Sequence, residues 1–332
     1  METAIYSRFF DPYNAFLHPE SLWMSVAIVL TLVVAWILVY VLGRSGNFSD
    51  ALRKELNLRI RSWAIMIPCI LLPILMGAAW VMLGILVLSI SCYREYARAT
   101  GLFRNSWTSF WVVVGILCIN VAVIDHWYGF FVALPSLGVI VLAAMAMFFA
   151  GPSGYLQRVA LAVLGYLLFG VCLGHLGYIA NDADYRPVMI LLFLCVEIND
   201  VFAYIFGKLF GRIKLAPEIS PNKTVGGALG ALIGTVTLLL SVGLFVFEGT
   251  PMGSFPHLIC LGGIVSVGGQ MGDLMLSSIK RDIGIKDIGN TIPGHGGFLD
   301  RFDSILLVAP GFFHYVHSVN GFGLKDPARI FF

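Results

Sequence analysis

Nine ionisable side chains are concentrated in residues 279–303, IKRDIGIKDIGNTIPGHGGFLDRFD, of an otherwise apolar chain. Acidic and basic residues are mixed there around the glycine-rich stretch 293–297. Glycine lets backbone N–H groups approach an anion closely, because no Cβ is in the way. Lysine and arginine complement phosphate oxygens, and carboxylates hold the divalent metal ion that polyphosphate chemistry normally needs. This mixture of charges favours a metal and nucleotide site over a solvated run of charge.

The preceding residues 272–281, GDLMLSSIKR, predict the end of a membrane helix that continues into a cytoplasmic loop. At the helical repeat of about 100° per residue, four polar side chains share one face: Asp273, Ser277, Lys280 and Arg281. An ionisable group at membrane depth is costly and usually faces a bundle interior or a wet cavity. We therefore predict that Asp273 is functional, with a purely structural bridge to Lys280 as the alternative.

A second polar set lies upstream, in residues 197–224. One face of the predicted span carries Glu197, Asp200, Tyr204 and Lys208. Two acids inside a span indicate an aqueous funnel. The loop beyond offers ligands for phosphate or for a lipid head group: Lys214, Ser220, Lys223 and Thr224. An exposed basic loop that meets anionic lipid is an equally good interpretation.

The composition is that of a membrane protein. Of the 332 residues, 58% are hydrophobic and only 12% are charged, whereas soluble domains carry about 25% charged residues. The net charge of +2 gives no reason to expect a nucleic acid partner. The six cysteines all lie in apolar stretches without a C-x-x-C pair, so neither a disulfide framework nor a zinc site is indicated.

Apolar stretches long enough to cross a bilayer recur along the chain. We therefore predict an all-α fold, a polytopic integral membrane helical bundle with about ten transmembrane helices. The candidate spans are 22–43, 63–78, 80–93, 107–124, 128–149, 158–179, 186–206, 226–248, 256–276 and 303–320, with a turn near 77–80. The chain divides into an N-terminal anchor helix with a basic cytoplasmic loop (1–62), an apolar transmembrane half (63–192) and a catalytic transmembrane half (193–332).

Alternate connecting segments carry most of the positive charge, as the positive-inside rule requires. Of 21 lysines and arginines, 17 fall in the segments 44–62, 94–106, 207–225 and 277–302 or at Arg158. We therefore predict a multi-pass protein with both termini non-cytoplasmic and the charged segment facing the cytoplasm. The membrane is the cytoplasmic membrane if the source is bacterial.

Residues 277–303 strongly resemble the signature of the phosphatidate cytidylyltransferase (CDP-diacylglycerol synthase) family, S-x-[apolar]-K-R-x4-K-D-x-G-x2-[apolar]-P-G-H-G-G-[apolar]-x-D-R-[apolar]-D, and fill every place in it. Residues 207–224, GKLFGRIKLAPEISPNKT, resemble its second motif. The resemblance implies transfer of a cytidylyl group from CTP to phosphatidate, giving CDP-diacylglycerol and pyrophosphate. It also implies Mg²⁺, with a second metal ion left open, membrane lipid as a partner, and a homodimer.

The resemblance, together with the charge pattern, predicts three groups of site residues. The catalytic group is Lys280, Arg281, Lys286 and Asp287. The metal ligands are Asp273 and Asp287. The substrate- and phosphate-binding group is Asp200, Ser220, Lys223, Thr224, Ser277, Gly294, His295, Gly296, Gly297, Asp300, Arg301 and Asp303.

Three positions depart from the family pattern. The family usually has Glu before the signature serine, where this chain has Leu276, and Trp followed by Glu or Gln after the second motif, where it has Val225 and Gly226. One alternative is therefore a divergent paralogue that acts on another lipid phosphate. The other is a non-enzymatic lipid-binding or ion-coupled transport protein that uses Glu197 and Asp200 as a relay.

Overall fold

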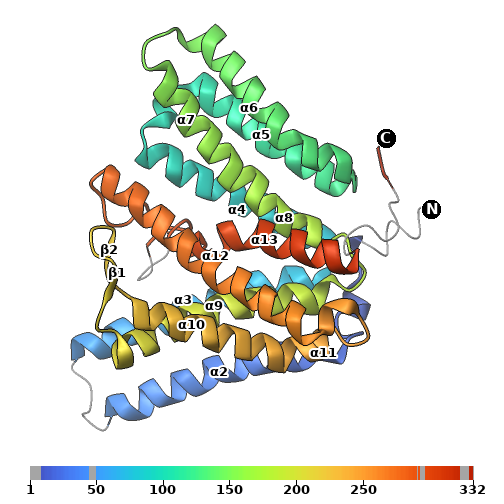
Figure 1. Ribbon diagram of the computed structural model, residues 1–332, viewed down its shortest axis with the longest axis vertical. Coiled ribbons are helices and arrows are strands. Elements are labelled where there is room, and N and C mark those ends of the chain that lie inside the picture. The colour runs from blue at the N-terminus through green and yellow to red at the C-terminus, as the bar shows by residue number, and fades with distance from the viewer. Residues whose placement is uncertain (1–8, 45–49, 290, 292–295, 322–328, 332) are drawn as a thin grey trace.

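The computed structural model describes residues 9–44, 50–289, 291, 296–321 and 329–331. Helices dominate this part of the chain, and a single two-stranded antiparallel hairpin interrupts them (Figure 1). The predicted all-α membrane bundle is confirmed. The hairpin was not predicted, because residues 207–225 were expected to be a loop throughout.

The first half of the chain forms helices separated by short turns. They are η1 (Pro12–Asn14), α2 (Pro19–Arg44), α3 (Asp50–Met76), α4 (Ala78–Ala99), η2 (Leu102–Arg104), α5 (Ser106–Ile124), α6 (Tyr128–Ala150), α7 (Tyr155–Gly165), the π-helical η3 (Tyr166–Cys172) and α8 (Leu173–Ile179).

The second half contains the hairpin and the long helices around it. Its elements are α9 (Tyr185–Phe210), β1 (Lys214–Ala216), β2 (Ser220–Thr224), α10 (Val225–Leu238), the π-helical η4 (Leu239–Gly243), α11 (Leu244–Val246), η5 (Pro251–Gly253), α12 (Phe255–Asp282) and α13 (Asp303–Asn320).

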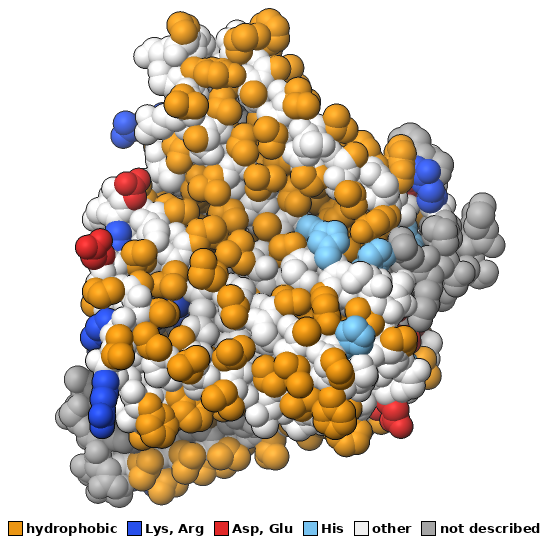
Figure 2. All heavy atoms as spheres, viewed as in Figure 1, with side chains coloured by type: hydrophobic (Ala, Val, Ile, Leu, Met, Phe, Trp, Pro, Cys, Tyr) orange, Lys and Arg blue, Asp and Glu red, His pale blue; other side chains and the backbone are white. Residues whose placement is uncertain are grey.

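Nine helical stretches of the described chain are long and apolar enough to cross a membrane. The tenth predicted span, 303–320, is also helical and forms α13, but it is not among these nine. Figure 2 shows a mainly hydrophobic face, as expected for a surface in contact with lipid, with charged side chains gathered mostly along the edge where the hairpin lies in Figure 1.

The helices extend further than the apolar pattern predicted. The segment 44–62 was expected to be a loop, but α3 begins at Asp50. Its residues are mostly strong helix formers, and Arg59 pairs with Glu55 one turn away at 2.8 Å. The predicted turn near 77–80 is confirmed at Gly77, whose φ of 133° is unfavourable for other residues.

Small residues bring the helices of the second half close together, as is common in membrane bundles. Gly230 and Gly234 of α10 leave room for the rings of Phe206 and Phe202 on α9. On α12, Gly272 lies against the carbonyl oxygen of Asp303, where α13 begins. Figure 1 shows the hairpin and the C-terminal end of α12 at one end of the bundle. The C-terminal end of α13 lies at the other end.

Candidate active site

A polar cavity of about 380 Å³ lies at the hairpin end of the bundle. Its walls come from α9, the hairpin, α10, α12, the segment after α12 and the start of α13. Ten of the predicted site residues line it: Asp200, Ser220, Lys223, Thr224, Asp273, Lys280, Asp287, Asp300, Arg301 and Asp303. Residues separated by 100 positions in the sequence thus share one polar space.

One wall of the cavity contains an ion pair between the hairpin and α12. The Nζ atom of Lys223 lies 2.6 Å from Oδ2 of Asp273. The other carboxylate oxygen of Asp273 accepts a hydrogen bond from the Ser277 hydroxyl at 3.1 Å. Ser277 does not itself line the cavity, and it acts on the site through Asp273. The predicted polar face of α12 is therefore present.

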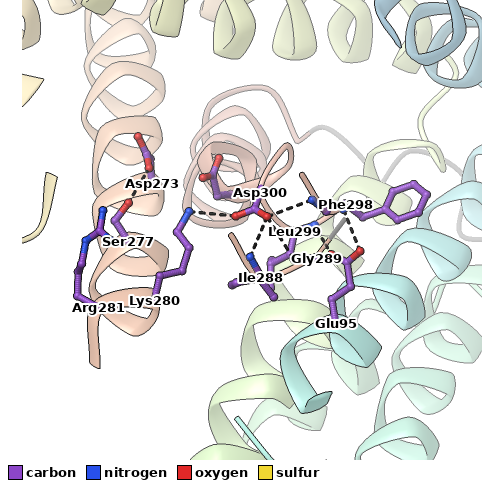
Figure 3. A network of polar contacts seen from close by, with 12 residues as sticks. Glu95, Asp273, Ser277, Lys280, Arg281, Ile288, Gly289, Phe298, Leu299 and Asp300 are labelled. Carbon is purple, nitrogen blue, oxygen red and sulfur yellow. Dashed lines mark hydrogen bonds and ion pairs between the residues drawn. The ribbon is translucent and has the colours of Figure 1, made fainter. Parts of the chain in front are cut away.

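A second ion pair at the cavity joins α12 to the segment that follows it (Figure 3). Lys280 Nζ lies 3.0 Å from Oδ1 of Asp300, and both side chains are largely buried. Asp300 Oδ2 also accepts hydrogen bonds from the backbone N–H groups of Ile288 and Gly297. The alternative of a bridge between Asp273 and Lys280 is not found, because each of the two has another partner.

Two further aspartates line the cavity beside the start of α13. Asp200 accepts a hydrogen bond from the Ser304 hydroxyl at 3.2 Å. Asp303 is buried and accepts one from the Ser304 backbone N–H at 2.8 Å. Among the described residues, five aspartates and three basic side chains therefore line the cavity. This excess of negative charge favours a cation in the occupied site.

The carboxylates suit a magnesium ion that arrives with a nucleotide. Within the described residues, no three His, Cys, Asp or Glu side chains lie close enough to hold a metal by themselves. Mg²⁺ usually keeps several waters and takes only one or two protein carboxylates together with substrate phosphates. Asp273 and Asp287, from two walls of the cavity, fit this hard-oxygen donor set.

Several predicted site residues lie elsewhere. Arg281 is exposed and its Nε donates to the carbonyl oxygen of Ile219, so it fastens the hairpin to α12. Lys286 is exposed and does not line the cavity. Gly296 does not line it either, and the N–H of Gly297 is bonded to Asp300. Gly294 and His295 lie outside the described residues.

Thr224 has a structural task in addition to its place in the cavity wall. It is the N-cap of α10, and its hydroxyl oxygen accepts the N–H of Gly227 at 3.1 Å. An N-cap side chain satisfies a backbone donor that has no partner inside the helix. Any contact of Thr224 with a substrate would therefore be made by a side chain that already holds the start of α10.

The sequence pattern missed one residue of this network, Glu95 on α4. Its carboxylate accepts hydrogen bonds from the N–H groups of Phe298 and Leu299 (Figure 3). It also accepts one from the Thr291 hydroxyl. The bonded residues are about 200 positions away in the sequence. Glu95 lies in the segment 94–106, whose basic residues we used only to predict the membrane orientation. No local sequence pattern distinguishes Glu95 there.

A helical multi-pass membrane protein with a lysine- and aspartate-lined cavity at one end is the class that this fold and site define. The model of the cytidylyltransferase family matches residues 57–319, and the chain belongs to this family. The matched region includes α4, the hairpin and α12, and thus every helix and strand that contributes to the cavity and its network.

Individual relatives divide into two kinds. The uncharacterized protein YnbB of Escherichia coli is 30% identical over 298 residues, which cover 88% of this chain and 95% of that protein. The phosphatidate cytidylyltransferase of Staphylococcus haemolyticus is 41% identical over 140 residues, which are 42% of this chain and 53% of the enzyme. The phosphatidate cytidylyltransferase of Bacillus subtilis is 39% identical over 156 residues, which are 46% of this chain and 56% of that enzyme. The matches to these enzymes thus span about half of their length.

Proposed function

We propose that this protein transfers a cytidylyl group from CTP to the phosphate of a membrane lipid, and that the lipid is phosphatidate. The products are CDP-diacylglycerol and pyrophosphate. The observation that carries the proposal is the cavity in which Lys223–Asp273 and Lys280–Asp300 pairs face one space at the end of a membrane bundle. Family membership supports the nucleotide, and the phosphatidate cytidylyltransferases among the relatives support the acceptor.

The proposed reaction needs positioning and charge neutralisation more than covalent help from the protein. An oxygen of the lipid phosphate attacks the α-phosphorus of CTP, a new P–O bond forms, and the bond to the pyrophosphate oxygen breaks. A phosphate monoester has a second pKa of about 6, so near neutral pH it is already largely dianionic and needs no strong base. Lys223, Lys280 and Arg301 are placed to neutralise phosphate oxygens along the cavity wall.

Asp273 and Asp287 are the residues proposed to hold Mg²⁺. When bound, the ion neutralises charge on the phosphate chain and helps to align it. One carboxylate oxygen of Asp273 is paired with Lys223, and the other accepts a hydrogen bond from the Ser277 hydroxyl. Both contacts keep its carboxylate turned toward the cavity before any ligand binds.

The lipid is proposed to enter from the side of the bundle. The cavity wall includes apolar and small residues of α9, the hairpin and α10: Ala203, Leu215, Gly227 and Ala228. These lie next to the polar residues and leave a less polar flank for the glycerol and the first acyl carbons. We expect this end to face the cytoplasm, with both termini on the other side, and we propose that the protein is a homodimer.

The direct test is product identification with purified protein in lipid nanodiscs. CTP, Mg²⁺ and a panel of phospholipids are supplied, and CDP-lipids are identified by mass spectrometry while pyrophosphate is measured separately. We expect both products with phosphatidate. A CDP-lipid formed only from another lipid phosphate would replace phosphatidate as the acceptor. No pyrophosphate and no CDP-lipid with any acceptor would rule out the proposed activity.

A further inference from the structure

We propose that Glu95 is a positioning residue of this site: its carboxylate, delivered by α4, holds the described residues of the segment between α12 and α13 (283–289, 291 and 296–302) in the place where they complete the cavity. The effect of Glu95 on catalysis rests on the proposed function, whereas its hydrogen bonds to the segment are independent of that function. Glu95 touches no cavity space itself. It acts through the segment that carries Asp287, Asp300 and Arg301, which line the cavity.

Both carboxylate oxygens of Glu95 accept hydrogen bonds from this one segment (Figure 3). Oε1 accepts the Thr291 hydroxyl at 2.6 Å and the Phe298 N–H at 3.1 Å, and Oε2 accepts the Leu299 N–H at 2.9 Å. Leu299 is fully buried, so water could not easily take the place of the Glu95 carboxylate if that side chain were removed. Among the described residues Glu95 forms no ion pair, which leaves these three donors as its partners.

Two glycines of the segment make room for the Glu95 carboxylate. A Cβ on Gly289 would lie 2.7 Å from Oε1, and a Cβ on Gly297 would overlap both carboxylate oxygens. Neither glycine has a positive φ, so the backbone conformation alone does not require glycine. The close approach of Glu95 is therefore a physical reason for glycine at these two positions.

A second carboxylate holds the same segment from the other side. Asp300 accepts the N–H groups of Ile288 and Gly297 and pairs with Lys280 of α12. Glu95 and Asp300 thus fix the backbone between α4 and α12, directly after Asp287 and directly before Arg301. Loss of Glu95 would release one of these two attachments and leave the N–H groups of Phe298 and of the buried Leu299 without this acceptor, which costs free energy.

The first experiment compares Glu95→Gln and Glu95→Ala with the wild type in nanodiscs. Glutamine keeps one acceptor oxygen but places an N–H₂ group opposite a donor, so it should fall between wild type and alanine. We expect hydrogen exchange at the Phe298 and Leu299 amides to accelerate at least tenfold in Glu95→Ala. We expect kcat/KM for CTP to fall at least tenfold per folded molecule. The matched control is Glu55→Gln, an exposed residue of α3 paired with Arg59, which should change neither quantity.

A double-mutant cycle tests the contact itself. Gly297→Ala should accelerate exchange at Leu299 in the wild type, because the new methyl group displaces the carboxylate. In Glu95→Ala the same change should add less than a threefold effect, since the group that it displaces is gone. Such non-additivity is the expected mark of two positions in direct contact.

The outcomes separate this proposal from the proposed function. Unchanged exchange in Glu95→Ala, or additive effects in the cycle, would overturn the contact. Faster exchange with an unchanged kcat/KM would reduce Glu95 to a purely structural role and overturn the positioning role. If the wild type forms no CDP-lipid, the proposed function fails and the catalytic part of this proposal fails with it, while exchange still decides whether Glu95 holds the segment.

Discussion

At the residue scale, the cavity is organised by lysines that already have aspartate partners. An ion pair in a partly buried place keeps both groups charged and oriented, although it contributes little net stability. In the proposed reaction Lys223 would exchange Asp273 for a phosphate oxygen when the nucleotide binds, and Asp273 would then be free to meet a cation. The acids and bases of the site thus depend on one another.

Asp273→Asn is the sharpest single test of this arrangement. The amide keeps the size of the side chain but removes the charge that faces Lys223 and any metal ion. Loss of one preorganised charge commonly costs about 100-fold or more in turnover. We therefore expect CTP-dependent pyrophosphate release to fall by roughly that factor, with normal membrane insertion. Asp282→Asn, at the exposed end of the same helix, is the control, and near-normal activity in Asp273→Asn would remove Asp273 from the mechanism.

Leu276 marks the departure from the usual signature, and its environment decides what an acid there would do. The side chain is fully buried on α12. A glutamate at this place would bury a carboxylate inside the bundle, which we expect to cost roughly 3 kcal/mol. Thermal unfolding in detergent should show a clear loss of stability for Leu276→Glu and almost none for Leu276→Met. A stable and more active Leu276→Glu protein would contradict this expectation.

The sequence predicted one local contact of the cavity wall, because the helical repeat places residues four apart on the same face. Asp273 and Ser277 meet across one helical turn, as the helical repeat required. The pairing of Lys280 with Asp300 could not be predicted, since it depends on how the chain folds back after α12. Glu95 was missed for the same reason, because it acts across about 200 residues of sequence.

At the element scale, close contact between α9 and α10 sets the position of one cavity wall. Asp200 and Tyr204 lie on α9, and Gly227 and Ala228 lie on α10. The apolar pattern predicted these spans but not their packing, because glycine in a membrane helix does not say which neighbour fills the space. Some helix ends were also predicted wrongly. A helix can continue beyond the apolar span into charged residues, as α3 does by beginning at Asp50.

Gly230→Ala should disturb this wall. The added methyl group would overlap the Cβ and ring of Phe206, and overpacking of this kind typically costs 1–3 kcal/mol. We expect a lower unfolding temperature and weaker cytidylyl transfer, because α9 and α10 must separate. Gly84→Ala on α4 is the matched control, since nothing lies within 4 Å of the place of its Cβ. Equal stability of the two variants would show that the α9–α10 contact is not limiting.

At the scale of the whole molecule, the C-terminal residues are attached far from the site. Asp125, at the end of α5, accepts the N–H groups of Ile330 and Phe331 and pairs with Arg329, which also lies over the ring of Trp127. Burial acts to raise the pKa of Asp125, but these hydrogen bonds and the Arg329 charge outweigh it and hold the pKa below its usual value.

This attachment should therefore depend on pH in one direction. A carboxyl group with a lowered pKa in the folded state stabilises that state above its unfolded pKa of about 3.9 and loses the effect as the pH falls through the folded value. Hydrogen exchange at Ile330 and Phe331 should stay slow from neutral pH to about pH 4 and accelerate below it, once corrected for the intrinsic rate. Asp125→Asn should accelerate it at all pH values, whereas the exposed Asp184→Asn should not. A pH-independent rate would contradict the assignment.

The bonds from Glu95 also bear on how the chain could be divided. The two halves of the chain, divided near residue 192, look separable in the sequence, yet α4 of the first half supplies the acceptor for two backbone N–H groups of the second. A gene fragment that encodes residues 193–332 alone would leave that anchor behind. If Glu95 has the proposed role, exchange of segments between related proteins would need an α4 that supplies such an acceptor to the backbone at residues 298 and 299.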